Sequence, residues 1–214
     1  MESATRPRPH PFDAIGESVA RRARGVADNV AGAIAFSWLT PNHLTLVGLI
    51  LTIGVAVVIA TGQLLVGGVL MIIVALFDML DGALARVQAR RSLFGAFLDS
   101  TIDRFSEAAI LIGILWFEPT REMGVLTMLV LTGSLLVSYA RARAEGLGID
   151  CEVGILPRPQ RVLILAAGLI SGLLVPALAL LAVLTHITVV QRVIHVRRTL
   201  CGAQPPSVND TGRS

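Results

Sequence analysis

Four aspartates concentrated in one stretch of the chain have the spacing of metal ligands. Asp78 and Asp81 are three residues apart, and Asp99 and Asp103 are four apart, so each pair shares a face if its segment is helical. The short connection at 87–94 makes the two segments antiparallel neighbours. Small residues on both segments let the backbones approach closely: Gly82, Ala85, Gly95 and Ala96. We therefore expect all four carboxylates to converge on one spot.

Carboxylate oxygens without Cys or His suit Mg²⁺ or Mn²⁺ better than zinc or copper. Two divalent ions would neutralise the four carboxylates almost completely. A site with two metal ions can hold a pyrophosphate, stabilise charge on a transferring phosphoryl group and orient an attacking oxygen. The alternative is that neighbouring arginines pair with these acids as internal salt bridges: Arg86, Arg90, Arg91 and Arg104.

The composition places these acids in a membrane protein. Of the 214 residues, 54% are hydrophobic and 15% are charged, and the mean hydropathy is +0.73, which disfavours a water-soluble enzyme. An ionised carboxylate near the centre of a membrane helix costs about 2.5–3.5 kcal/mol, so the four need compensation. All 18 basic residues are Arg, and with this composition the net charge of +3 indicates anionic lipid or phosphorylated substrates rather than nucleic acid.

The hydropathy pattern predicts an all-α integral membrane protein with six transmembrane helices and an N-terminal amphipathic juxtamembrane helix. Residues 1–12 are expected to be a disordered tail, 13–40 an amphipathic surface helix, 41–200 the membrane domain and 201–214 a second disordered tail. The alternative for residues 13–40 is a soluble helix packed on another element. The predicted spans are residues 42–61, 64–86, 95–117, 122–141, 160–175 and 176–198, the last two separated by a turn at Ser171, Gly172 and Pro176.

The arginines predict the orientation of these spans. With a cytoplasmic N-terminus, 17 of the 18 Arg lie on or near the cytoplasmic side and only Arg121 lies outside. This bias indicates an even number of spans in the cell membrane, with both termini cytoplasmic. The acidic site then opens toward the cytoplasm, about 10 Å below the membrane surface. Cys151 and Cys201 face a reducing compartment and are expected to be free thiols.

The acidic segment also resembles a known family signature. Residues Asp78-x2-Asp81-Gly82-x2-Ala85-Arg86-x8-Gly95-x3-Asp99-x3-Asp103 match all eight fixed positions of the signature of the CDP-alcohol phosphotransferase family. The resemblance implies a metal-dependent enzyme that forms a homodimer and displaces CMP from a CDP-linked lipid with the hydroxyl of a second alcohol. It also implies that Asp78, Asp81 and Asp99 bind metal, and that Asp103 is a further ligand or the catalytic general base.

Other residues are expected to bind the CDP-lipid. Gly82 leaves room for the nucleotide to approach the helix backbone, and Arg86, one turn further on, can meet a phosphate. Ser92 and the run at 41–45 resemble segments that contact the cytidine end of the donor in relatives, which assigns Asn42 and Thr45 to the same site. The alternative for Asn42 and Thr45 is that they are polar residues at a helix start.

Four arginines outside the signature are candidates for binding the phosphate of the acceptor: Arg141, Arg158, Arg161 and Arg192. Their alternative role is to snorkel to the cytoplasmic membrane surface. The stretches around Arg141 and Arg158 resemble family members that make phosphatidylinositol phosphate. Those relatives carry Lys in place of Arg141, and acidic residues in place of Pro157 and Gln160.

The expected activity is transfer of a phosphatidyl group from CDP-diacylglycerol to a phosphorylated polyol, with inositol phosphate as the first candidate. Glycerol phosphate, which would give phosphatidylglycerol phosphate, is the main alternative acceptor. Inositol, serine and an ether-lipid donor also remain open. A function of a different class, a divalent-cation transporter, is disfavoured because the carboxylates gather near one face and the outer halves of the spans offer no polar path.

Overall fold

The computed structural model describes residues 41–87 and 92–202, and within them the side chains of residues 42–78 and 92–201. The predicted N-terminal tail, the predicted surface helix at 13–40 and nearly all of the predicted C-terminal tail lie outside the described residues. The side chains of Asp81, Gly82 and Arg86 also lie outside them, although α3 continues through these positions.

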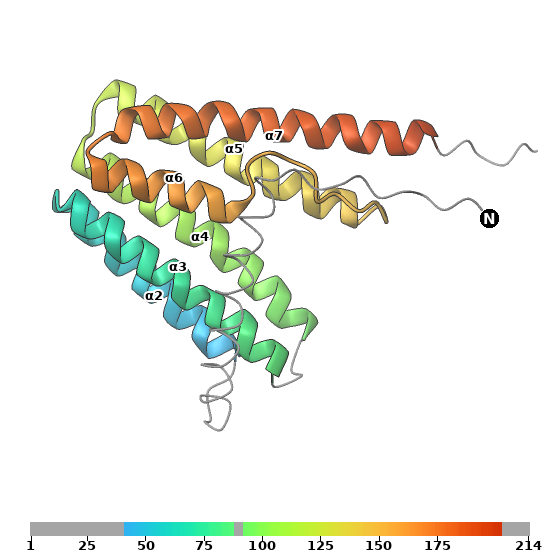
Figure 1. Cartoon of the computed structure of the whole chain (residues 1–214), viewed down its shortest axis with the longest axis horizontal. Helices are drawn as coiled ribbons and strands as arrows, with labels where there is room; N and C mark the ends of the chain where they lie inside the picture. Colours follow the sequence, from blue (N-terminus) through green and yellow to red (C-terminus); the bar gives the residue numbers. More distant parts are fainter. Residues whose placement is uncertain (1–40, 88–91, 203–214) are drawn as a thin grey trace, which may run out of the picture. The chain divides into compact units, whose positions relative to one another are not determined.

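The described residues form six helices joined by turns and loops (Figure 1). The helices are α2 (Pro41–Ala60), α3 (Leu64–Val87), α4 (Leu93–Phe117), α5 (Arg121–Glu145), α6 (Arg158–Ser171) and α7 (Leu174–Gly202). The prediction of an all-helical fold is confirmed for residues 41–87 and 92–202.

Local sequence signals set several helix ends. The Ser92 hydroxyl accepts a hydrogen bond from the backbone N–H of Gly95 at 2.8 Å, which caps the start of α4. The Thr120 hydroxyl does the same at the start of α5, accepting from the N–H of Met123 at 3.2 Å. Ser92 and Thr120, which lie in two of the polar segments between the predicted spans, therefore act as helix caps.

The boundary between the last two helices lies earlier than predicted. Gly172 takes the left-handed conformation, with φ 73°, and ends α6 at Ser171 after 14 residues. Pro176 lies within the first turn of α7, where proline is tolerated because the N–H it lacks would have no partner in the helix. The helix α7 is consequently much longer than α6, with 29 residues.

The chain divides into two compact units, each described by itself. The first comprises Met1–Leu51 and Ile73–Phe105, and contains the first half of α2, the end of α3 and the first half of α4. The second comprises Thr52–Ile72 and Ser106–Ser214. It contains the remaining parts of these three helices together with α5, α6 and α7. Three helices therefore run through both units.

Small residues allow close helix packing in the second unit. The backbone of Gly113 in α4 lies against the carbonyl of Ala56 in α2, and Gly133 in α5 lies against Thr185 in α7. A Cβ at either glycine would collide with these atoms. Membrane helices associate through such small-residue contacts, because lipid supplies no hydrophobic force between them.

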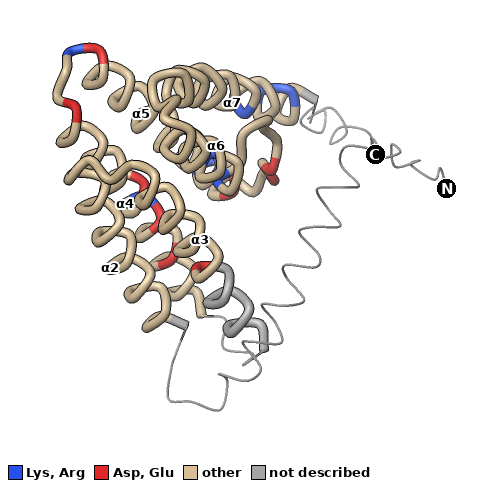
Figure 2. The backbone as a smooth tube through the Cα atoms, turned by 60° about the vertical axis from the view of Figure 1, so that its left-hand side comes forward, with Lys and Arg blue, Asp and Glu red and all other residues tan. Residues whose placement is uncertain are grey.

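The outer faces of the helices are apolar. Large side chains with more than half of their surface exposed include Ile50, Phe97, Ile112, Trp116 and Val183. Among the described residues, Asn42–Ala60, Arg121–Glu145 and Leu174–Cys201 are long and apolar enough to cross a membrane, and Leu64–Asp78 forms a shorter apolar segment. Figure 2 shows that most positions along the described helices are uncharged, with acidic positions inside α4 and basic positions toward the C-terminal end of α7. These features are those of a membrane protein.

Candidate active site

The helices α3 and α4 carry the four aspartates at the predicted helical spacing. Asp78 lies in α3, which continues through position 81, and Asp99 and Asp103 lie one turn apart in α4. Asp99 is exposed, and Asp78 and Asp103 are partly buried. The predicted helical context of both pairs is therefore confirmed.

Gly48 in α2 lies directly against the carboxylate of Asp78 in α3. A Cβ built on Gly48 would stand 2.6 Å from Asp78 Oδ1, which is closer than real Cβ contacts allow. The absent side chain therefore makes space for the carboxylate. This contact explains why a glycine fits at position 48, which the sequence pattern did not indicate.

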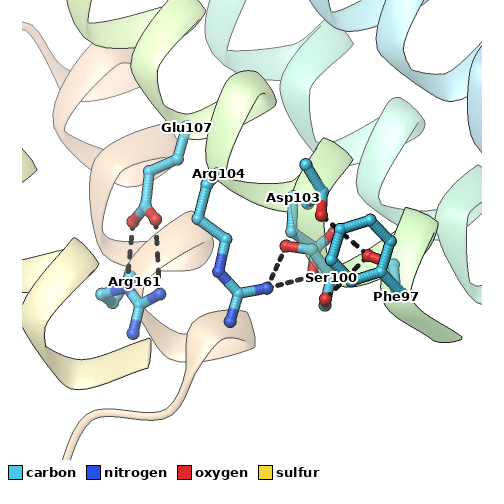
Figure 3. A network of polar contacts seen from close by, with 7 residues as sticks. Phe97, Ser100, Asp103, Arg104, Glu107 and Arg161 are labelled. Atoms are coloured by element: carbon cyan, nitrogen blue, oxygen red, sulfur yellow. Dashed lines mark hydrogen bonds and ion pairs between the residues drawn. The ribbon is translucent and has the colours of Figure 1, made fainter. Parts of the chain in front are cut away.

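The structure tests only part of the alternative in which neighbouring arginines form salt bridges with the four aspartates. Of the four neighbouring arginines, only Arg104 has a described side chain. Its Nη1 lies 3.9 Å from Asp103 Oδ2 and also donates to the backbone carbonyl of Ser100 (Figure 3). A separation of 3.9 Å is at the limit of an ion pair and does not neutralise Asp103 strongly.

The metal-ligating role of the acids remains a prediction. Among the described side chains, no three His, Cys, Asp or Glu residues are gathered closely enough to hold a metal ion, and Asp81 is not among those side chains. The chemistry of the donor set nevertheless fits a hard divalent cation, since each ligand candidate is a carboxylate. The close space beside Gly48 also holds the Asp78 carboxylate at a defined position.

Two residues predicted to bind the CDP-lipid meet at the start of α4. A Cβ on Gly95 would stand 2.9 Å from Ser92 Oγ and 3.1 Å from Asn42 Oδ1, so the two polar side chains border the same glycine. Thr45 lies one turn after Asn42 in α2 and is buried. Because Ser92 also caps α4, its structural role is established, and its role in binding the donor remains a prediction.

Arg161 forms a buried ion pair with Glu107 in α4. Its Nε donates to Glu107 Oε1 at 2.9 Å and its Nη2 donates to Oε2 at 3.4 Å (Figure 3). Its Nη1 donates to the backbone carbonyl of Leu156 at 3.4 Å. Sequence reasoning missed Glu107, although an acid one turn beyond Asp103 on the same helix was a usable signal.

Arg192 is buried in a different electrostatic setting. Only 5% of its surface is exposed, and its Nε donates to the carbonyl of Val153 at 2.9 Å while its Nη1 donates to that of Val137. Both acceptors are neutral. Within the described part of the chain, no carboxylate lies in ion-pair range of Arg192. Its position contradicts a snorkelling role, because the guanidinium is turned into the protein.

The other two candidate arginines are more accessible. Arg141 is exposed, and it pairs with Glu145 at 2.7 Å and with Glu152 at 3.4 Å. Arg158 is the first residue of α6 and is partly buried. The four arginines thus differ in burial and in charge compensation, which their sequence positions did not indicate.

Residues of α7 hold the loop that precedes α6. The backbone N–H of Ile155 donates to Gln191 Oε1 at 3.1 Å, and His195 Nε2 lies 3.0 Å from the carbonyl of Asp150. With the bond from Arg192 to Val153, these contacts fix the loop against one face of α7. Cys151, at the start of this loop, is buried, and both Cys151 and Cys201 are free thiols as predicted.

The sequence model of the CDP-alcohol phosphatidyltransferase family matches residues 38–196 of the chain. Archaetidylinositol phosphate synthase of Methanothermobacter thermautotrophicus is 40% identical over 197 residues, covering 87% of this chain and 98% of the relative. Phosphatidylinositol phosphate synthase of Mycobacteroides abscessus is 35% identical over 190 residues, covering 83% of this chain and 86% of the relative.

Solved structures agree with these sequence matches. The crystal structure of phosphatidylinositol phosphate synthase of Mycobacterium tuberculosis with CDP-DAG bound superposes with a TM-score of 0.75 at 31% identity, covering 88% of this chain and 99% of that one. The same enzyme in complex with manganese and citrate gives a TM-score of 0.74 at 30% identity, covering 87% and 93%. Together with the matched signature, these likenesses show that the chain belongs to the CDP-alcohol phosphatidyltransferase family, a family of metal-dependent membrane enzymes.

Proposed function

We propose that this enzyme transfers the phosphatidyl group of CDP-diacylglycerol to inositol phosphate, giving phosphatidylinositol phosphate and CMP. We choose a phosphorylated acceptor because the guanidinium of Arg192 is buried. Among the described residues, its hydrogen-bond partners are neutral backbone carbonyls only. A buried charge is costly unless an opposite charge accompanies it. The phosphate of the acceptor supplies that charge.

The names of the relatives favour inositol phosphate over glycerol phosphate. The archaeal and bacterial synthases differ in the lipid that their names specify and share inositol phosphate. The donor is proposed to be CDP-diacylglycerol, because the superposed crystal structure contains CDP-DAG.

Asp78, Asp81, Asp99 and Asp103 are proposed to hold two Mg²⁺ ions. When bound, these ions would neutralise the donor pyrophosphate and the charge that develops on the transferring phosphorus. The four carboxylates suit this role because they are short, hard oxygen ligands on two helices. Gly48 supports the arrangement by leaving space for the Asp78 carboxylate.

The reaction is a displacement at the phosphorus that bears the lipid. A hydroxyl oxygen of inositol phosphate bonds to this phosphorus, the phosphorus–oxygen bond to CMP breaks, and the hydroxyl proton must leave. Asp103 is proposed either to accept this proton or to act as a further metal ligand. We expect Asp103→Asn to abolish turnover and to preserve nucleotide binding if Asp103 is the base. Loss of CDP-lipid binding to the same degree would make Asp103 chiefly a ligand.

The donor head group is proposed to bind at the acidic segment. Gly82 gives access to the helix backbone and Arg86 meets a phosphate, while Asn42, Thr45 and Ser92 contact the cytidine end. The proximity of Asn42 and Ser92 to Gly95 supports a shared role for these two side chains.

We also propose that residues 41–200 form six transmembrane helices. The enzyme is proposed to be a homodimer. Residues 13–40 form an amphipathic helix on the membrane surface, and residues 1–12 and 201–214 are tails. The site and both termini face the cytoplasmic side of the cell membrane. Each of the six described helices exposes large apolar side chains, which supports burial of these helices in lipid.

A competition assay tests the proposed acceptor. Purified enzyme receives CDP-diacylglycerol, Mg²⁺ and equal concentrations of inositol phosphate, glycerol phosphate, inositol and serine, and the lipid products are resolved by mass spectrometry. We expect phosphatidylinositol phosphate with an equal amount of CMP. Consumption of glycerol phosphate with inositol phosphate left intact would overturn the acceptor assignment. Replacing the donor with its ether-lipid analogue tests the donor separately.

A further inference from the structure

Glu107 lies outside the aspartate signature and forms an ion pair with Arg161. Its side chain is 18% exposed, and the Arg161 side chain with which it pairs is 5% exposed. The two carboxylate oxygens meet Nε and Nη2 of the guanidinium, which is the two-pronged geometry that fixes the plane of an arginine (Figure 3).

The remaining bonds of Arg161 restrict it further. A guanidinium has five N–H groups, and Glu107 takes two of them while the carbonyl of Leu156 takes a third. The N–H groups left over belong to the two terminal nitrogens. Glu107 occupies the edge formed by Nε and Nη2. Among the described residues, the edge formed by Nη1 and Nη2 therefore keeps N–H groups available for a phosphate.

We propose that Glu107 is a positioning residue that orients Arg161 toward the phosphate of the acceptor and thereby contributes to acceptor specificity. This inference rests on the proposed function, in which Arg161 contacts that phosphate. It gives the carboxylate a role distinct from that of Asp103, which stands four residues earlier in α4.

The charges near Arg161 and Arg192 support different roles for these two arginines in binding the phosphate. The ion pair with Glu107 cancels much of the charge of Arg161, whereas Arg192 has only neutral partners within the described residues. Arg192 therefore supplies most of the attraction for a phosphate, and Arg161 supplies direction. A purely structural ion pair between α4 and α6 is the competing role, and buried pairs of this kind are weak evidence for stability.

The experiment compares Glu107→Gln and Glu107→Asp with wild type in steady-state assays that vary each substrate separately. Glu107→Gln retains one acceptor oxygen but loses the charge and the second bond. We expect kcat/KM for the phosphorylated acceptor to fall about 10- to 100-fold, since small misplacements of a binding group have effects of this size. The KM for CDP-diacylglycerol should stay within about twofold of wild type. Glu107→Asp should restore part of the loss.

Two controls separate positioning from folding. Glu122→Gln removes an exposed acid from the first turn of α5 and should leave both kinetic constants unchanged. In an Arg161→Ala background, Glu107→Gln should cause no further loss of kcat/KM for the acceptor, because Glu107 acts through Arg161. Thermal unfolding of each variant in detergent reports any loss of structure.

The results discriminate among the possibilities. Equal losses for donor and acceptor, additive losses in the Arg161→Ala background, or a lower unfolding temperature with unchanged acceptor kinetics would each overturn the positioning role. The proposed function fails separately, if the wild-type enzyme does not consume inositol phosphate. The same variants are then measured with the acceptor that the enzyme does consume, so the role of Glu107 is still decided.

Discussion

The backbone of Gly48 in α2 and the carboxylate of Asp78 in α3 are in such close contact that a Cβ on the glycine would stand 2.6 Å from Asp78 Oδ1. Gly48 lies outside the aspartate signature at residues 78–103. Its missing side chain fixes how near α2 approaches an acid that we propose to bind metal. The geometry of the acidic site therefore depends on a helix that contributes none of its carboxylates.

Replacing Gly48 tests this dependence. Gly48→Ala should displace the Asp78 carboxylate and reduce kcat by about 10- to 100-fold, because reacting groups are sensitive to shifts of about 1 Å. The matched control is Gly54→Ala in the same helix, where a Cβ would meet nothing within 4 Å. Turnover measured over a range of Mg²⁺ concentrations checks the effect. Equal activity of the two variants would show that the contact is unimportant.

Replacing Arg192 with lysine, the other residue with a permanent positive charge at neutral pH, should weaken binding of the acceptor. Lysine preserves the charge but has neither the planar fork nor the reach to two carbonyls, so Arg192→Lys should raise the KM for the acceptor by about tenfold or more. Arg198→Lys, on an exposed position of the same helix, is the control and should behave as wild type. Acceptor titrations at saturating CDP-diacylglycerol make the measurement. An unchanged acceptor KM would remove Arg192 from the binding site.

The loop before α6 should be disturbed by a single methyl group. Gly154 has φ 136°, and a Cβ there would stand 2.5 Å from Thr188 Cγ2 and 3.6 Å from Arg192 Nε. Gly154→Ala should therefore push the loop away from α7 and raise the acceptor KM. Gly148→Ala introduces a side chain at another positive φ, 76°, with nothing within 4 Å. A matching increase in that control would attribute the effect to backbone strain alone.

The close approach of Gly133 in α5 to Thr185 in α7 should contribute to the stability of the second unit. Gly133→Ala forces a methyl group against Thr185 and should lower the free energy of unfolding by roughly 1–3 kcal/mol, the usual cost of overpacking. Gly124→Ala, in the same helix, meets only Leu115 Cδ1 at 3.9 Å and should have little effect. Thermal unfolding in detergent compares the two. Similar midpoints would show that the helices separate easily at this point.

The sequence predicted the helices and the local chemistry because both depend on neighbouring residues. The spacing of Asp99 and Asp103 defined a shared helix face. The turn predicted at Ser171, Gly172 and Pro176 lay in the right region, but the predicted span ended at residue 175, whereas α6 ends at Ser171 because Gly172 takes a positive φ. The position of Pro176 was harder, since proline occurs both in loops and in first helical turns. The assignment of individual side chains to metal and substrates remains a prediction.

The tertiary partners were not predictable from the sequence. Arg161 and Glu107 are separated by 54 positions, and Arg192 lies 39 positions from the Val153 carbonyl that it binds. Sequence spacing indicates which side chains share a helix face, but it does not indicate which helices pack together. Only the fold shows that Arg161 pairs with Glu107, whereas Arg192 has neutral carbonyls as its hydrogen-bond partners among the described residues.

The 14 residues of α6 have a consequence for the surrounding lipid. A helix of this length measures about 21 Å at about 1.5 Å per residue, whereas the hydrocarbon core of a typical bilayer is about 30 Å thick. If α6 crosses the membrane as we propose, this hydrophobic mismatch would be met by thinning of the bilayer beside α6 or by a connecting loop that lies below the head groups. A water-soluble acceptor would then have less hydrocarbon to cross before it meets Arg158 and Arg161 at the start of α6.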